Sequence, residues 1–382
     1  MADWKSPLRA DPSEWLVLNA SAPVKFRLLT ELHSLPPTEP KIAALHDEAM
    51  KWPAAKAELR FQRMDGTWGG KIVAEPDKAD RSTEKILWQL FELTWNKENS
   101  KEVRKAAKPL KSLLAHKKEM PLFEFKQYAK QDPLRERHVV WQMRLVALGL
   151  LLRAGYVDDR KVVELVADLL ERATSFVADP VSRRPVELVG SGLPQLRREG
   201  FREGFCFIPD HYMLRIFAHF PALLDGGKAR NALKRVFDYV VSPDYQELGP
   251  QIGSVRVIRG TLERGGGIQL RPIEEYAEQG NLDELLYLLE QFARLGLINR
   301  YPQLMGYVDW LLQHQEKDGR WDLPQKCFGA KPLYHSWVRI EKDWKTANRR
   351  VADVTFRIML ILKYQWERQM KMLERGVDMY GY

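Results

Sequence analysis

A ten-residue pattern, L-x-x-Q-x-x-D-G-x-W, occurs twice in this chain and constrains its fold more than any other feature. Its fixed positions are Leu59, Gln62, Asp65, Gly66 and Trp68 in the first copy and Leu312, Gln315, Asp318, Gly319 and Trp321 in the second. Each copy follows an amphipathic stretch and precedes a long loop. A motif that recurs in this way indicates one supersecondary unit repeated around a stacked or closed helical array.

Apolar spacing predicts helices almost throughout the chain. Apolar residues recur every three or four positions in many separate segments, as one face of a helix requires. The expected helices span 24–34, 41–63, 82–94, 101–115, 135–153, 160–177, 209–220, 228–241, 282–295, 302–315, 345–364 and 366–375. The one short run with β-type residues, 254–258, lies inside an expected loop. We therefore expect an all-α chain.

The connections between these helices alternate in length. Long ones span 64–81, 116–134, 178–208, 242–281 and 316–344, whereas the intervening ones are short. This alternation predicts an α/α toroid, a double ring of about six inner and six outer helices. Residues 1–40 would form an N-terminal helical extension whose HEAT-like helix closes the ring. Residues 41–364 would form the toroid repeats, and 365–382 a peripheral C-terminal helix and tail.

Charge and cysteine content bound the class of protein. The net charge of +9 favours anionic partners, although a solvated basic surface is the simpler interpretation. Two cysteines imply no disulfide framework. The first residues contain no apolar run that would suggest a signal peptide, and the longest apolar run, 145–152, is too short to span a bilayer. We therefore expect a cytoplasmic protein.

The paired motifs resemble the Q-W repeat of squalene–hopene cyclases and the related repeats of protein prenyltransferase β subunits. In that superfamily the Gln caps a helix, the Gly allows a turn, and the Trp stacks under the Gln side chain. The chain is thus similar to a divergent member of the terpenoid cyclase and protein prenyltransferase superfamily. The resemblance assigns the structural role of the repeat to Gln62, Gly66, Trp68, Gln315, Gly319 and Trp321.

The same resemblance implies a central aromatic cavity that binds an isoprenoid-like or other apolar ligand. Cation–π contacts with its rings would stabilise a carbocation if the protein is a catalyst. The residues expected to bind the ligand are Trp88, Trp141, Tyr212, Tyr287, His335 and Trp337.

Asp353 is the candidate catalytic acid. Type II terpene cyclases carry D-x-D-D-T, and the nearest segment, Val351-Ala352-Asp353-Val354-Thr355, matches at the middle Asp and the Thr. Both flanking carboxylates are absent, which makes the acid motif degenerate and catalysis doubtful. The alternative is a buried Asp that accepts hydrogen bonds or pairs with Arg349, Arg350 or Arg357.

Asp210 and His211 form a second candidate pair. An Asp beside a His could orient a general base. However, Pro209-Asp210 is also a typical helix start, with Asp as the N-cap and His in the first turn. The sequence favours capping.

Two clusters contain the Asp, Cys and His ligands that hold zinc in protein prenyltransferases. One is Cys206, Asp210 and His211, and the other is Asp322, Cys327 and His335 beside Tyr334. Neither has compact ligand spacing, so no metal or other cofactor is expected. The segment Arg264-Gly265-Gly266-Gly267 could cradle a phosphate, but a flexible linker is the simpler interpretation.

Two functions remain open. The first is a terpene cyclase-like toroid that binds an isoprenoid-like or other apolar molecule and that, if it is an enzyme, performs type II cyclase chemistry. The second is a non-catalytic helical-repeat scaffold that contacts a partner, such as nucleic acid, through a basic face.

Overall fold

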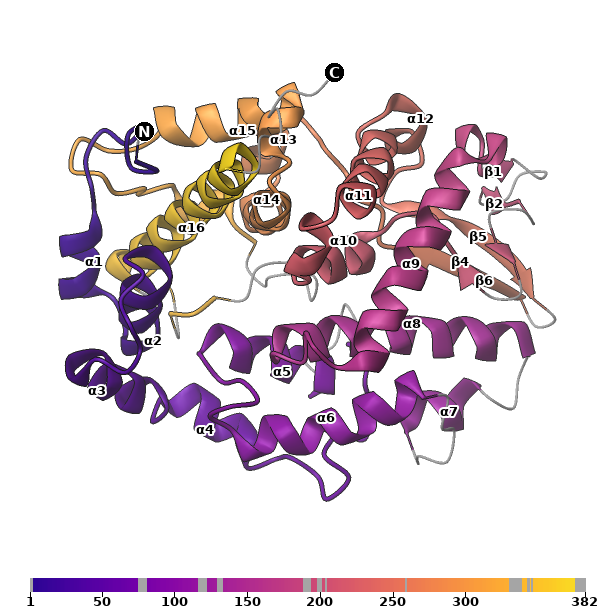
Figure 1. Ribbon diagram of the computed structural model, residues 1–382, viewed down its shortest axis with the longest axis horizontal. Helices are drawn as coiled ribbons and strands as arrows, with labels where there is room; N and C mark the ends of the chain where they lie inside the picture. Colours follow the sequence, from indigo (N-terminus) through magenta and orange to yellow (C-terminus); the bar gives the residue numbers. More distant parts are fainter. Residues whose placement is uncertain are drawn as a thin grey trace. The chain divides into compact units, whose positions relative to one another are not determined.

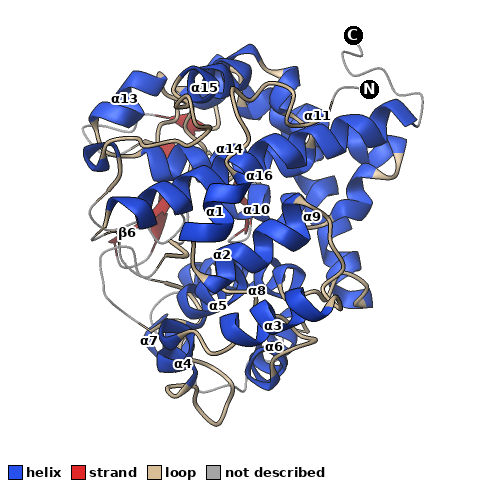
Figure 2. Cartoon of the chain, turned by 90° about the vertical axis from the view of Figure 1, so that its left-hand side faces the viewer, coloured by secondary structure: helices blue, strands red, loops and turns tan. Residues whose placement is uncertain are grey.

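The computed structural model describes all residues except 1–2, 75–80, 116–121, 129–132, 188–193, 198–200, 203–204, 258–259, 330–338, 342–343, 345 and 375–382. Most of the described residues are helical, which confirms the expected helical class (Figure 2). Among the described residues, no helix combines the length and the apolar composition needed to cross a lipid bilayer.

The chain forms two compact units. Unit 1 contains Met1–Arg60, Trp88–Trp95 and Arg271–Tyr382, and unit 2 contains Phe61–Leu87 and Asn96–Leu270. Helix α5 (Thr83–Glu92) contributes residues to both units.

Unit 1 is built around two long helices that lie side by side, α14 (Leu282–Leu295) and α16 (Ala347–Glu374) (Figure 1). Gly296 ends α14 in the left-handed region with φ of 70°, as a glycine after a helix commonly does. The other elements are α1 (Ser13–Asn19), α2 (Ala22–Arg27), the π-helix η1 (Leu28–Leu32), α3 (Pro40–Ala49), α4 (Pro53–Leu59), α13 (Ile273–Glu278), η4 (Ile298–Arg300), α15 (Pro302–Gln313) and η5 (Gln325–Cys327).

Two expected helix boundaries in unit 1 were wrong. The helix expected at 41–63 is divided into α3 and α4, because Pro53 cannot continue a helix and starts the next one instead. The break expected at 365 is absent from α16, which contains neither Gly nor Pro and buries Lys363 and Gln365. The segment 365–374 is therefore the end of a central helix rather than a separate peripheral one.

Unit 2 packs helices around α8 (Pro133–Arg153), which contacts α6 (Lys101–Leu114), α9 (Arg160–Ala178) and α10 (His211–Ala218). Its remaining helices are α7 (Phe123–Tyr128), η2 (Pro180–Arg183), η3 (Pro221–Leu224), α11 (Gly227–Val240) and α12 (Pro243–Gln246). Asp159 caps α9 by accepting hydrogen bonds from the backbone of Lys161 and Val162.

Unit 2 also contains strands that the helical pattern did not predict. The strands β1 (Val186–Glu187), β2 (Gln195–Leu196), β5 (Gln251–Val257) and β6 (Gly260–Gly265) form a sheet in the order β1-β2-β5-β6, in which only β2 and β5 are parallel. Strands β3 (Phe201–Arg202) and β4 (Phe205–Cys206) pair separately. The expected linker at 264–267 is wrong, because Gly265 ends β6 and Gly266 accepts a hydrogen bond from the His211 backbone.

The two copies of the repeat make the same contacts within their own units. In unit 2, Gln62 Nε2 donates to the carbonyl oxygens of Gly66 and Glu102 at 3.1 and 2.8 Å. In unit 1, Gln315 Nε2 donates to the carbonyl oxygens of Gly319 and Ala10 at 2.7 and 3.0 Å. Each Gln thus ties its own turn to a segment that is distant in the sequence.

The glycine and tryptophan of each copy also match. Gly66 and Gly319 have φ of 88° and 89°, which favours glycine. Trp68 and Trp321 are fully buried. The backbone N–H of Trp68 donates to Thr83 Oγ1 at 3.1 Å, and that of Trp321 donates to Thr355 Oγ1 at 3.0 Å. The ten-residue pattern therefore encodes one turn geometry twice.

Candidate functional site

Asp353 is fully buried in unit 1, on α16. Its Oδ2 accepts hydrogen bonds from the backbone N–H of Ile340 at 3.0 Å and of Glu341 at 3.4 Å, and from Trp344 Nε1 at 3.2 Å. Its Oδ1 is enclosed without a hydrogen-bond partner. Burial raises the pKa of Asp353 to about 7, although the nearby Arg357 charge opposes the rise. The carboxyl group thus holds Ile340, Glu341 and Trp344 against α16.

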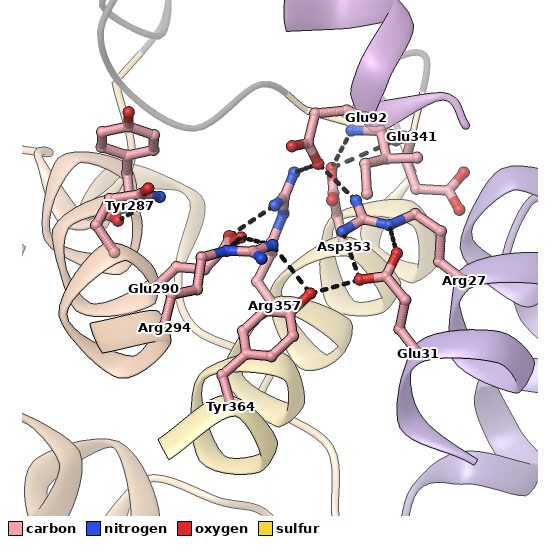
Figure 3. A network of polar contacts seen from close by, with 12 residues as sticks. Arg27, Glu31, Glu92, Tyr287, Glu290, Arg294, Glu341, Asp353, Arg357 and Tyr364 are labelled. Carbon is pink, nitrogen blue, oxygen red and sulfur yellow. Dashed lines mark hydrogen bonds and ion pairs between the residues drawn. The ribbon is translucent and has the colours of Figure 1, made fainter. Parts of the chain in front are cut away.

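The arginines beside Asp353 have other carboxylate partners. Figure 3 shows a closed ring of buried polar contacts in unit 1. Arg357 pairs with Glu92 and with Glu290, the latter at 2.9 Å. The ring passes from Arg27 through Glu92, Arg357, Glu290, Arg294, Tyr364 and Glu31 back to Arg27. It joins α2, η1, α5, α14 and α16, so its members are satisfied structurally rather than directed at a ligand.

Arg350, which the sequence also offered as a partner for Asp353, has a carboxylate partner of its own. Arg350 pairs with Asp322 at 2.6 Å. Asp353 therefore fits the sequence interpretation of a hydrogen-bonded buried Asp better than that of a catalytic acid.

Asp210 is an N-cap, as the sequence favoured. Its Oδ1 accepts a hydrogen bond at 2.8 Å from the backbone N–H of Met213, in the first turn of α10. His211 lies 3.1 Å from the Gly266 carbonyl oxygen through its Nδ1, and its ring contacts the Tyr212 ring. Both His211 and Tyr212 are buried rather than open to solvent.

The four described residues of the expected ligand-binding set belong to different units. Trp88 and Tyr287 belong to unit 1, whereas Trp141 and Tyr212 belong to unit 2. His335 and Trp337 lie outside the described residues, as does Tyr334. Of the four described residues, Trp141 lines the cavity described next.

A cavity of about 420 Å³ lies in unit 2 between α8 and α9. The side of α8 that faces it carries Trp141, Arg144, Leu145 and Leu148, at the spacing of one helix face. Leu114 of α6 and the α9 residues Leu165 and Leu169 complete its apolar floor, and Phe205 and Phe207 close one side. Lys161, Glu164, Asp168 and Arg172 of α9 form a charged rim.

Three aromatic rings form one wall of this α8–α9 cavity. The Trp141 ring meets the Phe205 and Phe207 rings edge-on, with centroids 5.3 and 5.7 Å apart. The two Phe rings are stacked, with an interplanar angle of 17°. Such edge-to-face and stacked contacts fix the rings and leave an ordered apolar surface for a ligand.

Arg144 differs from the other charged residues that line the cavity. It is 9% exposed, its Nε is enclosed without a partner, and within the described chain no hydrogen bond or ion pair involves its guanidinium. Burial lowers the pKa of Arg144, which Asp168 opposes and Arg172 reinforces. The other charged side chains of the rim are at least two-fifths exposed and lie in ion pairs along α9.

Sequence reasoning found Trp141 but missed Arg144 and the α9 side of the cavity. One signal was available: Arg144 directly precedes the apolar run 145–152, where a cation is unusual.

No group of three or more His, Cys, Asp or Glu side chains suited to a metal ion occurs in the part of the chain that the structure describes. Cys206 and Cys327 are buried free thiols. His335, the imidazole of the second expected cluster, lies outside the described residues.

Comparisons with models of known protein families, with curated proteins and with solved structures found no match for this chain.

Proposed function

We propose that this protein binds a small apolar molecule, isoprenoid-like in size and character, in the α8–α9 cavity of unit 2. The observation that carries the proposal is the cavity itself, with its volume of about 420 Å³ and its three ordered rings above a leucine floor. Small-molecule sites are typically concave and mostly apolar, with volumes of roughly 300–1,000 Å³ and a few polar groups. The α8–α9 cavity has each of these properties.

The environment of Asp353 supports binding over catalysis. Alkene protonation needs an exposed, very strong acid that faces the substrate. Asp353 instead accepts three N–H hydrogen bonds on one oxygen, and neither cavity described for the chain, in unit 1 or in unit 2, includes it. A pKa raised to about 7 also describes a weak acid. We therefore assign Asp353 a structural role.

We further propose that the helices close into an α/α toroid. The supporting contacts lie in unit 1, where the N-terminal segment meets the second copy of the repeat. The backbone N–H of Arg9 donates to Gln315 Oε1 at 2.7 Å, and Gln315 Nε2 donates to the Ala10 carbonyl oxygen. Joining the first residues to a turn near position 315 is what closure of a repeat array requires.

Binding can be tested with the neutral dye Nile red, whose fluorescence rises in apolar surroundings, and with farnesol as a competitor. Wild-type protein is expected to show saturable fluorescence that farnesol suppresses. Leu165→Trp should abolish both the saturable fluorescence and its suppression by farnesol, because the larger side chain fills the cavity from α9. Val163→Trp, on an exposed position of the same helix, is the matched control and should bind normally. Equal binding by both variants would place the dye elsewhere and defeat the proposal.

A second candidate function, binding of nucleic acid, is favoured by one face of α6. Lys101, Arg104 and Lys108 are exposed at three- and four-residue spacing, which suits contact with phosphates. Fluorescence anisotropy with short single- and double-stranded oligonucleotides tests this function. Glu substitutions at all three positions should eliminate salt-sensitive binding if α6 carries it, and binding that survives them would exclude α6.

A further inference from the structure

The α8–α9 cavity also indicates the chemical class of its ligand. We infer that the ligand carries a terminal oxyanion, a carboxylate or a phosphate, which Arg144 binds while the apolar chain lies against Trp141, Phe205 and Phe207. This inference rests on the proposed binding function and adds the head group to it.

Within the described chain, Arg144 lacks a partner of its own. The side chain is nine-tenths buried and lines the cavity, yet no hydrogen bond or ion pair in the described chain involves it. Other buried arginines show the usual arrangement: Arg27 and Arg357 each pair with two carboxylates, and Arg215 pairs with Glu84 at 3.1 Å. A buried guanidinium without a counter-charge is costly, because it loses hydration and gains no hydrogen bond.

The carboxylates that line the cavity are already engaged. Both oxygens of Asp168 accept from Arg172 Nε at 2.8 Å. Glu164 accepts from Arg160 at 2.8 Å and lies 3.6 Å from Lys161. Because each of these carboxylates pairs with a cation of α9 itself, neither is left to pair with Arg144. The positive charge of Arg144 therefore remains for a molecule that enters the cavity.

Arg144 lies beside the apolar side chains that line the cavity. Leu145 and Leu148 lie on the same face of α8, and Trp141 lies one turn before Arg144. An amphipathic molecule can thus place an anionic end on the guanidinium and its chain on the rings and leucines. Guanidinium–oxyanion contacts are charge-assisted and often bidentate, which makes them stronger than contacts between neutral groups.

The experiment compares three competitors with the same alkyl chain: dodecanol, dodecanoate and dodecyl phosphate. Each is titrated against Nile red bound to the wild-type protein. At least one of the two anions is expected to compete about 10- to 100-fold more tightly than the alcohol, as a charge-assisted hydrogen bond would give. Comparing dodecanoate with dodecyl phosphate shows which oxyanion the site prefers.

Two variants test the role of Arg144 itself. Arg144→Met keeps an apolar chain of similar length without the charge, and should reduce anion affinity to that of dodecanol while dodecanol affinity stays unchanged. Lys228→Met removes an exposed cation from α11, outside the cavity lining, and is the matched control, with wild-type selectivity expected. Anion preference that survives Arg144→Met would overturn the inference.

A measurement without ligand separates this role from a structural one. If Arg144 is unpaired in the empty protein, Arg144→Met should raise the melting temperature. Dodecanoate or dodecyl phosphate should stabilise the wild type more than dodecanol does, and should stabilise the Arg144→Met variant no more than dodecanol does. A lower melting temperature with unchanged anion selectivity would make Arg144 structural and overturn the inference. Equal competition by alcohol and anions in wild-type protein would refute the inference alone, whereas no saturable Nile red binding would refute the proposed function as well.

Discussion

At the scale of single residues, Asp353 makes the stability of the folded chain depend on pH. Burial raises the pKa of Asp353 from 3.8 to about 7 in the folded chain. Between these values the folded protein keeps a proton that the unfolded chain has released. The contribution of protonated Asp353 to the free energy of unfolding is therefore complete below about pH 4 and is lost as the pH rises to about 7.

Asp353→Asn should remove this dependence, because the amide oxygen can accept the same N–H groups without ionising. The free energy of unfolding of the wild type, relative to the variant, should fall by up to roughly 4 kcal/mol between pH 4 and pH 8. Urea unfolding at a series of pH values measures the difference. If the free energies of unfolding of the wild type and of the Asp353→Asn variant changed in parallel with pH, Asp353 would not titrate in this range.

Gly319 provides a second prediction at the residue scale. With φ of 89°, an added Cβ would lie 2.4 Å from the Ala10 carbonyl oxygen. Gly319→Ala should therefore destabilise unit 1, since both the backbone conformation and the close approach exclude a side chain. Gly306→Ala is the matched control: it lies inside α15 with open space around it, and should stabilise by up to about 1 kcal/mol. Thermal unfolding measures both effects. Equal melting temperatures for Gly319→Ala and Gly306→Ala would contradict a close approach of Gly319 to the Ala10 carbonyl oxygen.

At the scale of elements, the repeat turns are expected to be structural. Trp321→Ala should lower the free energy of unfolding by roughly 3–5 kcal/mol because the ring is fully buried. Its Nε1 also donates to the Leu311 carbonyl oxygen at 2.6 Å, which ties the turn to α15. Trp68→Ala should act similarly on unit 2. Met64→Ala, at a 92% exposed position beside the first turn, should change stability by less than about 0.5 kcal/mol. Equal melting temperatures for all three variants would contradict a structural role.

The elements that could be predicted from the sequence are those with local signals. Helix α9 has an Asp cap and a regular apolar face, and α10 begins at the expected Asp210 cap. The β5–β6 hairpin was missed because its strands are stabilised by pairing with each other and with β2, far away in the sequence.

The candidate site was predictable only in part for the same reason. Trp141 could be proposed as an aromatic residue on a helix, but the importance of Arg144 depends on α9 covering it while supplying no free carboxylate. Likewise, the sequence offered arginines as partners for Asp353, whereas its hydrogen bonds come from Ile340, Glu341 and Trp344. Neighbours that are distant in sequence decide these roles.

At the scale of the whole molecule, the N-terminal segment is part of unit 1 rather than an extension of it. Arg9 donates from Nη1 to the Gln315 carbonyl oxygen at 2.8 Å and from Nη2 to the Gln313 carbonyl oxygen at 3.0 Å. Trp4 is 6% exposed and lines a cavity of about 260 Å³ with Ile298 and Ile361. These contacts join the first ten residues to the region around α15 and α16.

Deletion of residues 1–10 should therefore weaken unit 1 selectively. The Gln315 amide would lose its contacts with Arg9 and Ala10 and keep its hydrogen bond to Gly319, and the apolar side chains beside Trp4 would become exposed. Hydrogen exchange should accelerate at residues 313–321 and along α16, while α8 and α9 of unit 2 should exchange at the wild-type rate. Arg9→Ala should reproduce part of the effect at 313–321. Lys5→Ala, which removes a partly exposed ion pair with Asp11 and a cation–π contact with Trp4, is the control and should have little effect on exchange at 313–321. Unchanged exchange at 313–321 in the deletion variant would show that the second repeat turn does not depend on the N-terminal segment, and would remove the main support for closure of the array.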